Sequence, residues 1–113
     1  MNVSPDELFS LFLKPWSEQG VRVKAFGDGR CFNAIIEGFI FEGNGRIWIS
    51  PSAEQARDAS FGLTFLMDKV RTSEYGEPRE APLEDRAFVE AEMVSGLMIE
   101  LVSRERIWIY QLP

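Results

Sequence analysis

The sequence contains no histidine and a single cysteine, and both facts narrow the chemistry that the chain can perform. Without histidine there is no Ser-His-Asp triad, no Cys-His pair and no imidazole ligand for a metal ion. Cys31 has no second cysteine with which to form a disulfide. It lies beside Phe32 in an apolar run, where a free cysteine usually behaves as a small buried hydrophobe. We therefore expect no metal and no cofactor.

Long apolar runs and clustered positive charge are also missing. No stretch reaches the roughly 18 apolar residues of a membrane span. The acidic Asp6 and Glu7 lie where a signal peptide would carry positive charge. The Lys and Arg residues form no stripe of the kind that binds nucleic-acid phosphates. These absences predict a cytoplasmic protein that binds neither membranes nor nucleic acid.

The formal net charge of −6 is concentrated in one segment, residues 72–85, which carries one arginine against five acidic residues and contains two prolines and a glycine. This composition predicts an acidic loop. One interpretation is a solubilising linker. The other is a docking segment for a basic protein partner, with charge from Glu77 and Glu80 and Tyr75 as an aromatic anchor.

The N-terminal half predicts a helix followed by an antiparallel meander. Ser4 and Glu7 form a capping box, which predicts a helix over residues 5–14 that ends before Pro15. Alternating and apolar segments separated by glycine-containing turns then predict three strands. Gly38, inside the second of these strands, is expected to form a bulge or bend. The predicted strands span residues 21–27, 31–42 and 46–50.

The C-terminal half predicts a second helix and a second meander. Apolar residues after Ser52 fit a helical stripe through about residue 70. An alternative is a short helix to about Ala59, followed by a strand in which Phe61, Leu63, Phe65 and Met67 share a face. Three further strands are expected at residues 86–93, 96–103 and 106–112. The predicted fold class is α+β: a single domain over residues 1–113 in the order α-βββ-α-βββ, with antiparallel meanders packed against two helices.

The tetrapeptide Arg-Ile-Trp-Ile occurs twice, at residues 46–49 and 106–109. Each copy follows a glycine, four residues ending in Glu, and a turn, and the two turns differ in length. A weak internal duplication explains this echo, and so does the shared composition of β-strands.

Both copies are expected to be strands, in which alternate residues point to opposite faces. The β-branched isoleucines should then face the core. The opposite face is our candidate protein interface, because Trp, Tyr and Arg are enriched at binding hot spots. The alternative is that a helix covers this face. The candidate residues are Arg46, Trp48, Arg106, Trp108 and Tyr110, and the acidic segment adds Tyr75, Glu77 and Glu80.

Carboxylates offer one possible site for acid–base chemistry. Glu90 and Glu92 share a predicted strand face, and Glu100 is expected across from them. Paired carboxylates raise one another's pKa values. The competing interpretation is a solvated strand face. The glycines at 27–29 and 43–45 lie between strands and are turn residues rather than a phosphate cradle.

No motif identifies a family. The order of elements is loosely similar to that of bacterial secretion chaperones, and the size and acidity are like those of immunity proteins. We expect a non-enzymatic protein-binding module that forms a homodimer through a strand edge. The alternative is a small-ligand-binding protein or a carboxylate-dependent enzyme with a pocket near Glu90, Glu92 and Glu100.

Overall fold

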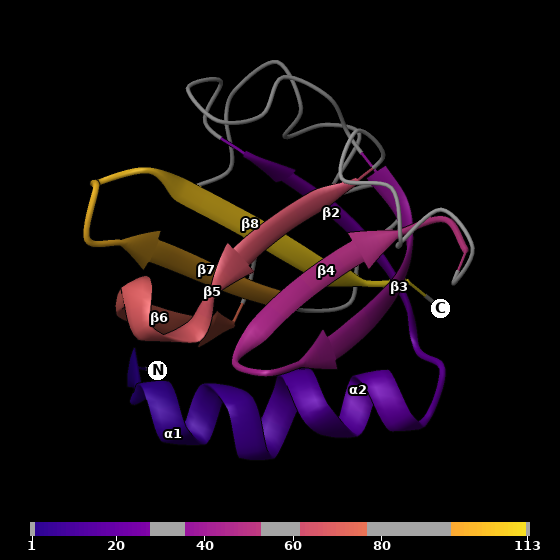
Figure 1. The fold of residues 1–113 in the computed structure, drawn as a ribbon, viewed down its shortest axis with the longest axis horizontal. Helices are drawn as coiled ribbons and strands as arrows, with labels where there is room; N and C mark the ends of the chain where they lie inside the picture. Colours follow the sequence, from indigo (N-terminus) through magenta and orange to yellow (C-terminus); the bar gives the residue numbers. More distant parts are fainter. Residues whose placement is uncertain (1, 28–35, 53–61, 77–95, 113) are drawn as a thin grey trace.

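The computed structural model describes residues 2–27, 36–52, 62–76 and 96–112. Within these ranges one antiparallel sheet of eight strands curls above a single helical segment (Figure 1). The α+β class predicted from the sequence is therefore compatible with the structure, although strands dominate. Residues 28–35, 53–61 and 77–95 lie outside the described ranges, and the predictions made for them are not tested.

The helical segment begins as the sequence predicts. Ser4 Oγ accepts from the Glu7 N–H and Glu7 Oε1 accepts from the Ser4 N–H, each at 3.2 Å, which completes the capping box. Three consecutive pieces make up the segment: α1 (Pro5–Glu7), the π-helical η1 (Leu8–Leu13) and α2 (Lys14–Glu18).

The prediction that Pro15 ends this helix is wrong. Proline disrupts a regular helix because it lacks an N–H and clashes with the carbonyl four residues earlier. Here the wider π-helical turn precedes it, and Pro15 occupies the first turn of α2, where a missing N–H is tolerated. The helix ends instead at Gly20, which has a φ of +64°. The Gly20 N–H bonds the Ser17 carbonyl and the Val21 N–H bonds the Trp16 carbonyl, as in a Schellman motif.

All eight strands run antiparallel to their neighbours, in the spatial order β1-β6-β7-β8-β2-β3-β4-β5. The predicted meander of the N-terminal half is present as β2, β3 and β4. Pairing between β2 and β8 joins it to the C-terminal strands. The strands are β1 (Asn2–Val3), β2 (Arg22–Gly27), β3 (Ile36–Gly43), β4 (Arg46–Ser50), β5 (Leu63–Leu66), β6 (Val70–Gly76), β7 (Gly96–Leu101) and β8 (Arg106–Gln111).

The sheet must curl because of one short connection. β5 lies at one end of the strand order, β6 lies next to the other end, and only the 3-10 turn η3 (Met67–Lys69) joins them. Three residues span only about 10 Å, so the two ends of the sheet approach each other. The curled sheet thereby encloses the core from several sides, and the helical segment runs along one of its open sides (Figure 1).

Two element predictions need correction. The helix favoured through residue 70 is not formed at its C-terminal end, because Leu63–Leu66 is strand β5. Of the alternative, the strand with Leu63 and Phe65 on one buried face is observed, but Met67 lies in the 3-10 turn and not in the strand. The short helix and Phe61 lie outside the described residues. The acidic loop predicted at 72–85 begins later than expected, because β6 extends to Gly76.

The main core fills the concave side of the sheet. It combines the inward side chains of the strands with Leu8, Leu13 and Trp16 of the helical segment, all of which are buried. Large β-branched and aromatic side chains suit a half-buried pleated surface. The four tetrapeptide isoleucines belong to this core: Ile47, Ile49, Ile107 and Ile109.

Gly38 does not form the predicted bulge, because β3 pairs in unbroken register with β2. A Cβ at this position would lie 2.1 Å from the Ser50 carbonyl oxygen. The glycine is therefore required for close approach of the backbone that leaves β4.

The internal sequence repeat does not extend to the geometry of the two hairpins. In the first hairpin Phe41 pairs with Trp48, whereas in the second Met98 pairs with Trp108. Aligned on the Gly and Glu of the repeat, Phe41 corresponds to Ile99, which faces the core. A one-residue change of register reverses every side chain, so the similarity is limited to the tetrapeptide itself.

Candidate functional site

Both copies of the tetrapeptide are extended, with isoleucines inward and tryptophans outward, as the sequence predicts. Ile47, Ile49 and Ile109 are completely buried and Ile107 is 1% exposed. The first copy lies in β4 and the second in β8. The backbone orientation of the candidate residues is therefore confirmed, but the surroundings of the two copies differ.

Arg46 and Trp48 lie together on the outer face of β4, and both are partly exposed. The Arg46 guanidinium carbon is 6.0 Å from the centroid of the indole ring, within range of a cation–π contact. Arg46 Nη1 also donates to Thr64 Oγ1 on β5 at 3.4 Å. These contacts hold a cation and a large ring side by side without removing either from water.

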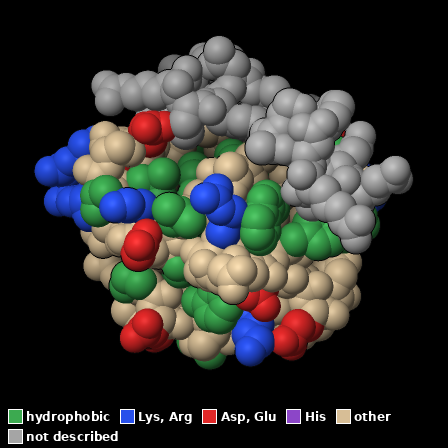
Figure 2. Space-filling model, viewed as in Figure 1, with side chains coloured by type: hydrophobic (Ala, Val, Ile, Leu, Met, Phe, Trp, Pro, Cys, Tyr) green, Lys and Arg blue, Asp and Glu red, His purple; other side chains and the backbone are tan. Residues whose placement is uncertain are grey.

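Partly exposed apolar side chains surround this pair. Phe41 lies directly opposite Trp48 on β3, and Phe39 follows on the same face. Leu66 lies opposite Arg46 on β5. We call this surface the outer aromatic face; it consists of Phe39, Phe41, Arg46, Trp48 and Leu66. In the space-filling view, hydrophobic side chains lie around a basic one over β4 and β5 (Figure 2).

Trp108 and Tyr110 do not belong to this surface. They are 3% and 2% exposed and form a separate cluster with Phe26, against which Met98 packs. The rings of Phe26 and Trp108 are stacked, with centroids 5.4 Å apart and planes 16° apart. The prediction of one exposed patch formed by both tetrapeptides is therefore wrong.

The strand order explains this result. β8 lies between β7 and β2, not at an edge, and both β2 and β3 separate it from β4. Gly96 also makes room for the Tyr110 ring, since a Cβ there would lie 2.3 Å from Tyr110 Cδ1.

The edge strand β5 carries no charge. Its sequence is Leu-Thr-Phe-Leu, and among the described residues it pairs with β4 alone. The Met67 N–H donates to the Gly45 carbonyl at 2.8 Å. Hydrogen-bonded pairs alternate along an antiparallel ladder, so the backbone groups of Thr64 and Leu66 point away from β4. Edge strands are usually protected by charge or proline, and β5 has neither.

Tyr75 has a structural position rather than that of a free aromatic anchor. It lies in β6, packs against the main core, and its ring stacks on Phe12 with centroids 4.6 Å apart. Glu77 and Glu80, the other candidates from the acidic segment, lie outside the described residues.

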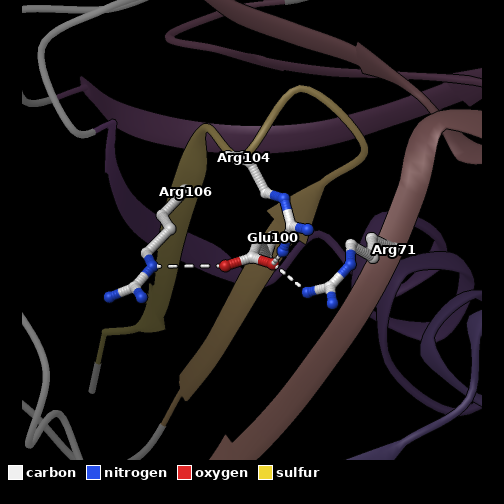
Figure 3. Close-up of polar contacts among 4 residues, drawn as sticks. All are labelled: Arg71, Glu100, Arg104 and Arg106. Carbon is white, nitrogen blue, oxygen red and sulfur yellow. Dashed lines mark hydrogen bonds and ion pairs between the residues drawn. The ribbon is translucent and has the colours of Figure 1, made fainter.

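Three arginines surround Glu100, a grouping that was not predicted from the sequence (Figure 3). Arg71 Nη1 on β6 donates to Glu100 Oε2. Arg104 Nη1, in the turn between β7 and β8, is 3.6 Å from the same oxygen, and Arg106 Nε on β8 is 3.5 Å from Oε1.

These contacts hold the pKa of Glu100 below its ordinary value, first through the hydrogen bond from Arg71 and then through the three positive charges. A carboxylate with a lowered pKa is a poor proton donor at neutral pH. The lowered pKa of Glu100 disfavours a role as proton donor. Whether Glu100 lies across from Glu90 and Glu92 is not tested. Glu90 and Glu92 lie outside the described residues.

A groove lies between the start of the helical segment and the β3–β4 turn. It is lined by Pro5, Asp6, Phe9, Ser10, Gly45, Met67 and Asp68. Glu100 is not among these residues, so this groove is not the pocket expected near it.

Two further searches gave no candidate within the described ranges. No group of three or more Cys, Asp or Glu side chains there is placed to hold a metal ion. No described helix has the length and apolar character needed to cross a membrane. Comparisons of the chain with protein-family models, curated proteins and solved structures found no match.

Proposed function

We propose that the chain is a non-enzymatic protein-binding module, and that its main contact surface is the outer aromatic face together with the β5 edge. The observation that carries the proposal is a partly exposed Trp48, held beside Arg46, next to an edge strand without charge. Large rings and guanidinium groups dominate the energetics of protein interfaces. An unprotected edge offers backbone groups to a second strand.

The outer aromatic face is rigidly supported. Ile47 and Ile49 flank Trp48 in sequence and are fully buried on the other side of the sheet. The ring therefore projects from a fixed strand rather than from a loop. A preorganised contact loses little conformational entropy on binding.

We propose a second copy of this chain as the partner at the β5 edge. Antiparallel pairing of two β5 strands around a two-fold axis would use the outward backbone groups of Thr64 and Leu66 in both copies. It would also bring the two Trp48 side chains onto one continuous outer face. We also propose a basic protein partner for the acidic segment that contains Glu77 and Glu80, and a cytoplasmic location.

Sedimentation equilibrium over a range of concentrations tests the proposed dimer. Thr64→Pro removes one outward N–H from the edge, whereas Thr64→Ala removes the side-chain hydroxyl and keeps the N–H. We expect at least tenfold weaker self-association for Thr64→Pro, because proline cannot donate to a strand ladder. Thr64→Ala loses the contact of Thr64 Oγ1 with Arg46 but keeps the outward N–H, so we expect it to weaken self-association less than Thr64→Pro does.

Leu66→Lys is a second disruptive variant, because charge at an edge opposes pairing. It keeps the test decisive if Thr64→Pro does not fold. A chain that stays monomeric at all concentrations, or that dimerises equally well with Leu66→Lys, contradicts the proposal. Trp48→Ala should weaken the dimer without unfolding the monomer.

A further inference from the structure

The groove between the start of the helical segment and the β3–β4 turn has the size of a ligand site. Its volume is about 700 Å³, within the roughly 300–1,000 Å³ that is typical of such sites. Three segments that are distant in the sequence meet there: residues 5–10, Gly45 and the η3 turn (Figure 1). The Met67 N–H donates to the Gly45 carbonyl at 2.8 Å, which fixes η3 against the β3–β4 turn.

The apolar part of the lining is Pro5, Phe9 and Met67. Phe9 and Met67 are half-buried and pack against the main core, so the parts of them that reach the groove belong to a fixed surface. The face of a phenyl ring attracts a cation electrostatically. An aliphatic stem that ends in a positive charge would therefore find favourable contacts on this surface.

The polar side chains of the lining are all hydrogen-bond acceptors toward a ligand. Asp6 in α1 and Asp68 in η3 are exposed and supply carboxylates from two different segments. Ser10 Oγ donates its proton to the Asp6 carbonyl at 2.8 Å, so the hydroxyl meets a ligand with its lone pairs. A ligand that complements these groups must donate hydrogen bonds.

The negative charge of the groove is not neutralised within the described part of the chain. None of the described lining residues is a lysine or arginine. No described cation forms an ion pair with either carboxylate. Arg46 and Lys69 are the nearest cations along the chain, but Arg46 lies over the Trp48 ring and Lys69 is exposed outside the lining. In the space-filling view, acidic side chains lie above and below hydrophobic ones between η3 and the start of the helical segment (Figure 2).

We propose that this groove receives a lysine or arginine side chain from a basic segment of a protein partner. The cationic group would lie between Asp6 and Asp68, with its stem against Phe9 and Met67. Two carboxylates and an apolar lining complement such a side chain in both charge and polarity. The inference rests on the proposed protein-binding function, and it gives the basic partner proposed there a contact on the folded domain.

Fluorescence anisotropy with a short labelled peptide of arginine and leucine tests the groove. The control ligand is the same peptide with citrulline, which keeps the shape of arginine without its charge. Asp68→Asn is the decisive variant, because it removes one charge and keeps the size of the side chain. Asp6 also stabilises the start of the helix through its charge, so Asp6→Asn is used only together with Asp68→Asn.

Glu18→Gln is the matched control variant. Glu18 is also an exposed carboxylate of the helical segment, but it lies in α2 and does not line the groove. The change therefore alters the net charge by the same amount as Asp68→Asn, outside the proposed contact.

We expect Asp68→Asn to weaken binding of the basic peptide about fivefold and the double variant more than about tenfold, as for partly exposed ion pairs. Glu18→Gln should leave the affinity nearly unchanged. Equal weakening by Glu18→Gln would show a general charge effect and overturn the proposal. Unchanged affinity in the double variant would place any binding elsewhere, as on the acidic segment, with the same consequence. Equal binding of the citrulline peptide, or of free arginine, would overturn the assignment to a basic protein segment.

Self-association separates this inference from the proposed dimer. Asp68→Asn should dimerise like the original chain, and Thr64→Pro should bind the basic peptide like the original chain. A chain that binds the peptide through Asp68 but stays monomeric would contradict the β5 dimer and leave the groove assignment intact. A dimer whose Asp68→Asn variant keeps full peptide affinity would contradict the groove assignment alone.

Discussion

Replacing Trp108 by alanine should destabilise the protein far more than the same change at Trp48, although the two residues occupy the same place in the repeated tetrapeptide. Trp108 is 3% exposed and stacks on Phe26. Trp48 is partly exposed and has a guanidinium over its ring. The comparison tests directly whether the two copies have different surroundings.

The expected loss of unfolding free energy for Trp108→Ala follows from the burial of the indole ring and from its Nε1 donor. Truncating a buried tryptophan to alanine costs about 3–5 kcal/mol, of which the aromatic stack contributes about 1 kcal/mol. Nε1 of Trp108 is buried and has no hydrogen-bond acceptor among the described residues, and its removal returns part of this cost. We expect a net loss of about 3 kcal/mol for Trp108→Ala and about 1 kcal/mol for Trp48→Ala.

Urea denaturation followed by circular dichroism measures both losses without relying on tryptophan fluorescence. For a domain of this size 1 kcal/mol corresponds to roughly 4 °C in Tm, so Trp108→Ala should melt about 12 °C lower. Trp108→Phe keeps a stacked ring and removes the unpartnered donor, and it should cost less than about 1 kcal/mol. It supplies a measurable variant if Trp108→Ala does not fold. Equal losses at Trp48 and Trp108 would refute the assignment of their surroundings.

Two further predictions concern acid stability and close packing. The folded-state pKa of Glu100 is lowered from its ordinary value of 4.5, so its cluster stabilises the fold above that pH and the contribution is lost as pH falls through the lowered value. Urea midpoints between neutral and acidic pH should therefore decline less steeply for Glu100→Gln, and identical slopes would contradict this. Gly38→Ala should lose about 2 kcal/mol or more of unfolding free energy, because its Cβ would lie 2.1 Å from the Ser50 carbonyl oxygen. Gly43→Ala is the control: its nearest contact would be at 3.7 Å, and it should lose less than about 1 kcal/mol. Thermal melting of both variants measures the difference.

The sequence predicted those features that depend on neighbouring residues. The capping box of Ser4 and Glu7 was correct because it needs only residues three apart. The inward isoleucines of β4 and β8 were correct because strand alternation is local. The end of the helix was predicted from Pro15 alone, whereas the positive-φ Gly20 is the local feature that follows the observed end.

The features that failed depend on contacts between distant parts of the chain. Trp108 is buried because β8 pairs with β2 and β7, and no local pattern reveals those partners. The cluster at Glu100 was missed for the same reason, since Arg71 reaches it only through pairing of β6 with β7. The two arginines at 104 and 106 are a local feature of the sequence, but nothing local shows that Arg71 joins them.

Amide hydrogen exchange along β5 at several protein concentrations tests the central proposal most directly. The N–H groups of Leu63 and Phe65 point toward β4 and should be protected at every concentration. Those of Thr64 and Leu66 point outward, and the proposed pairing of two β5 strands predicts that their protection rises with concentration. Fast exchange at Thr64 and Leu66 throughout the range would contradict the account.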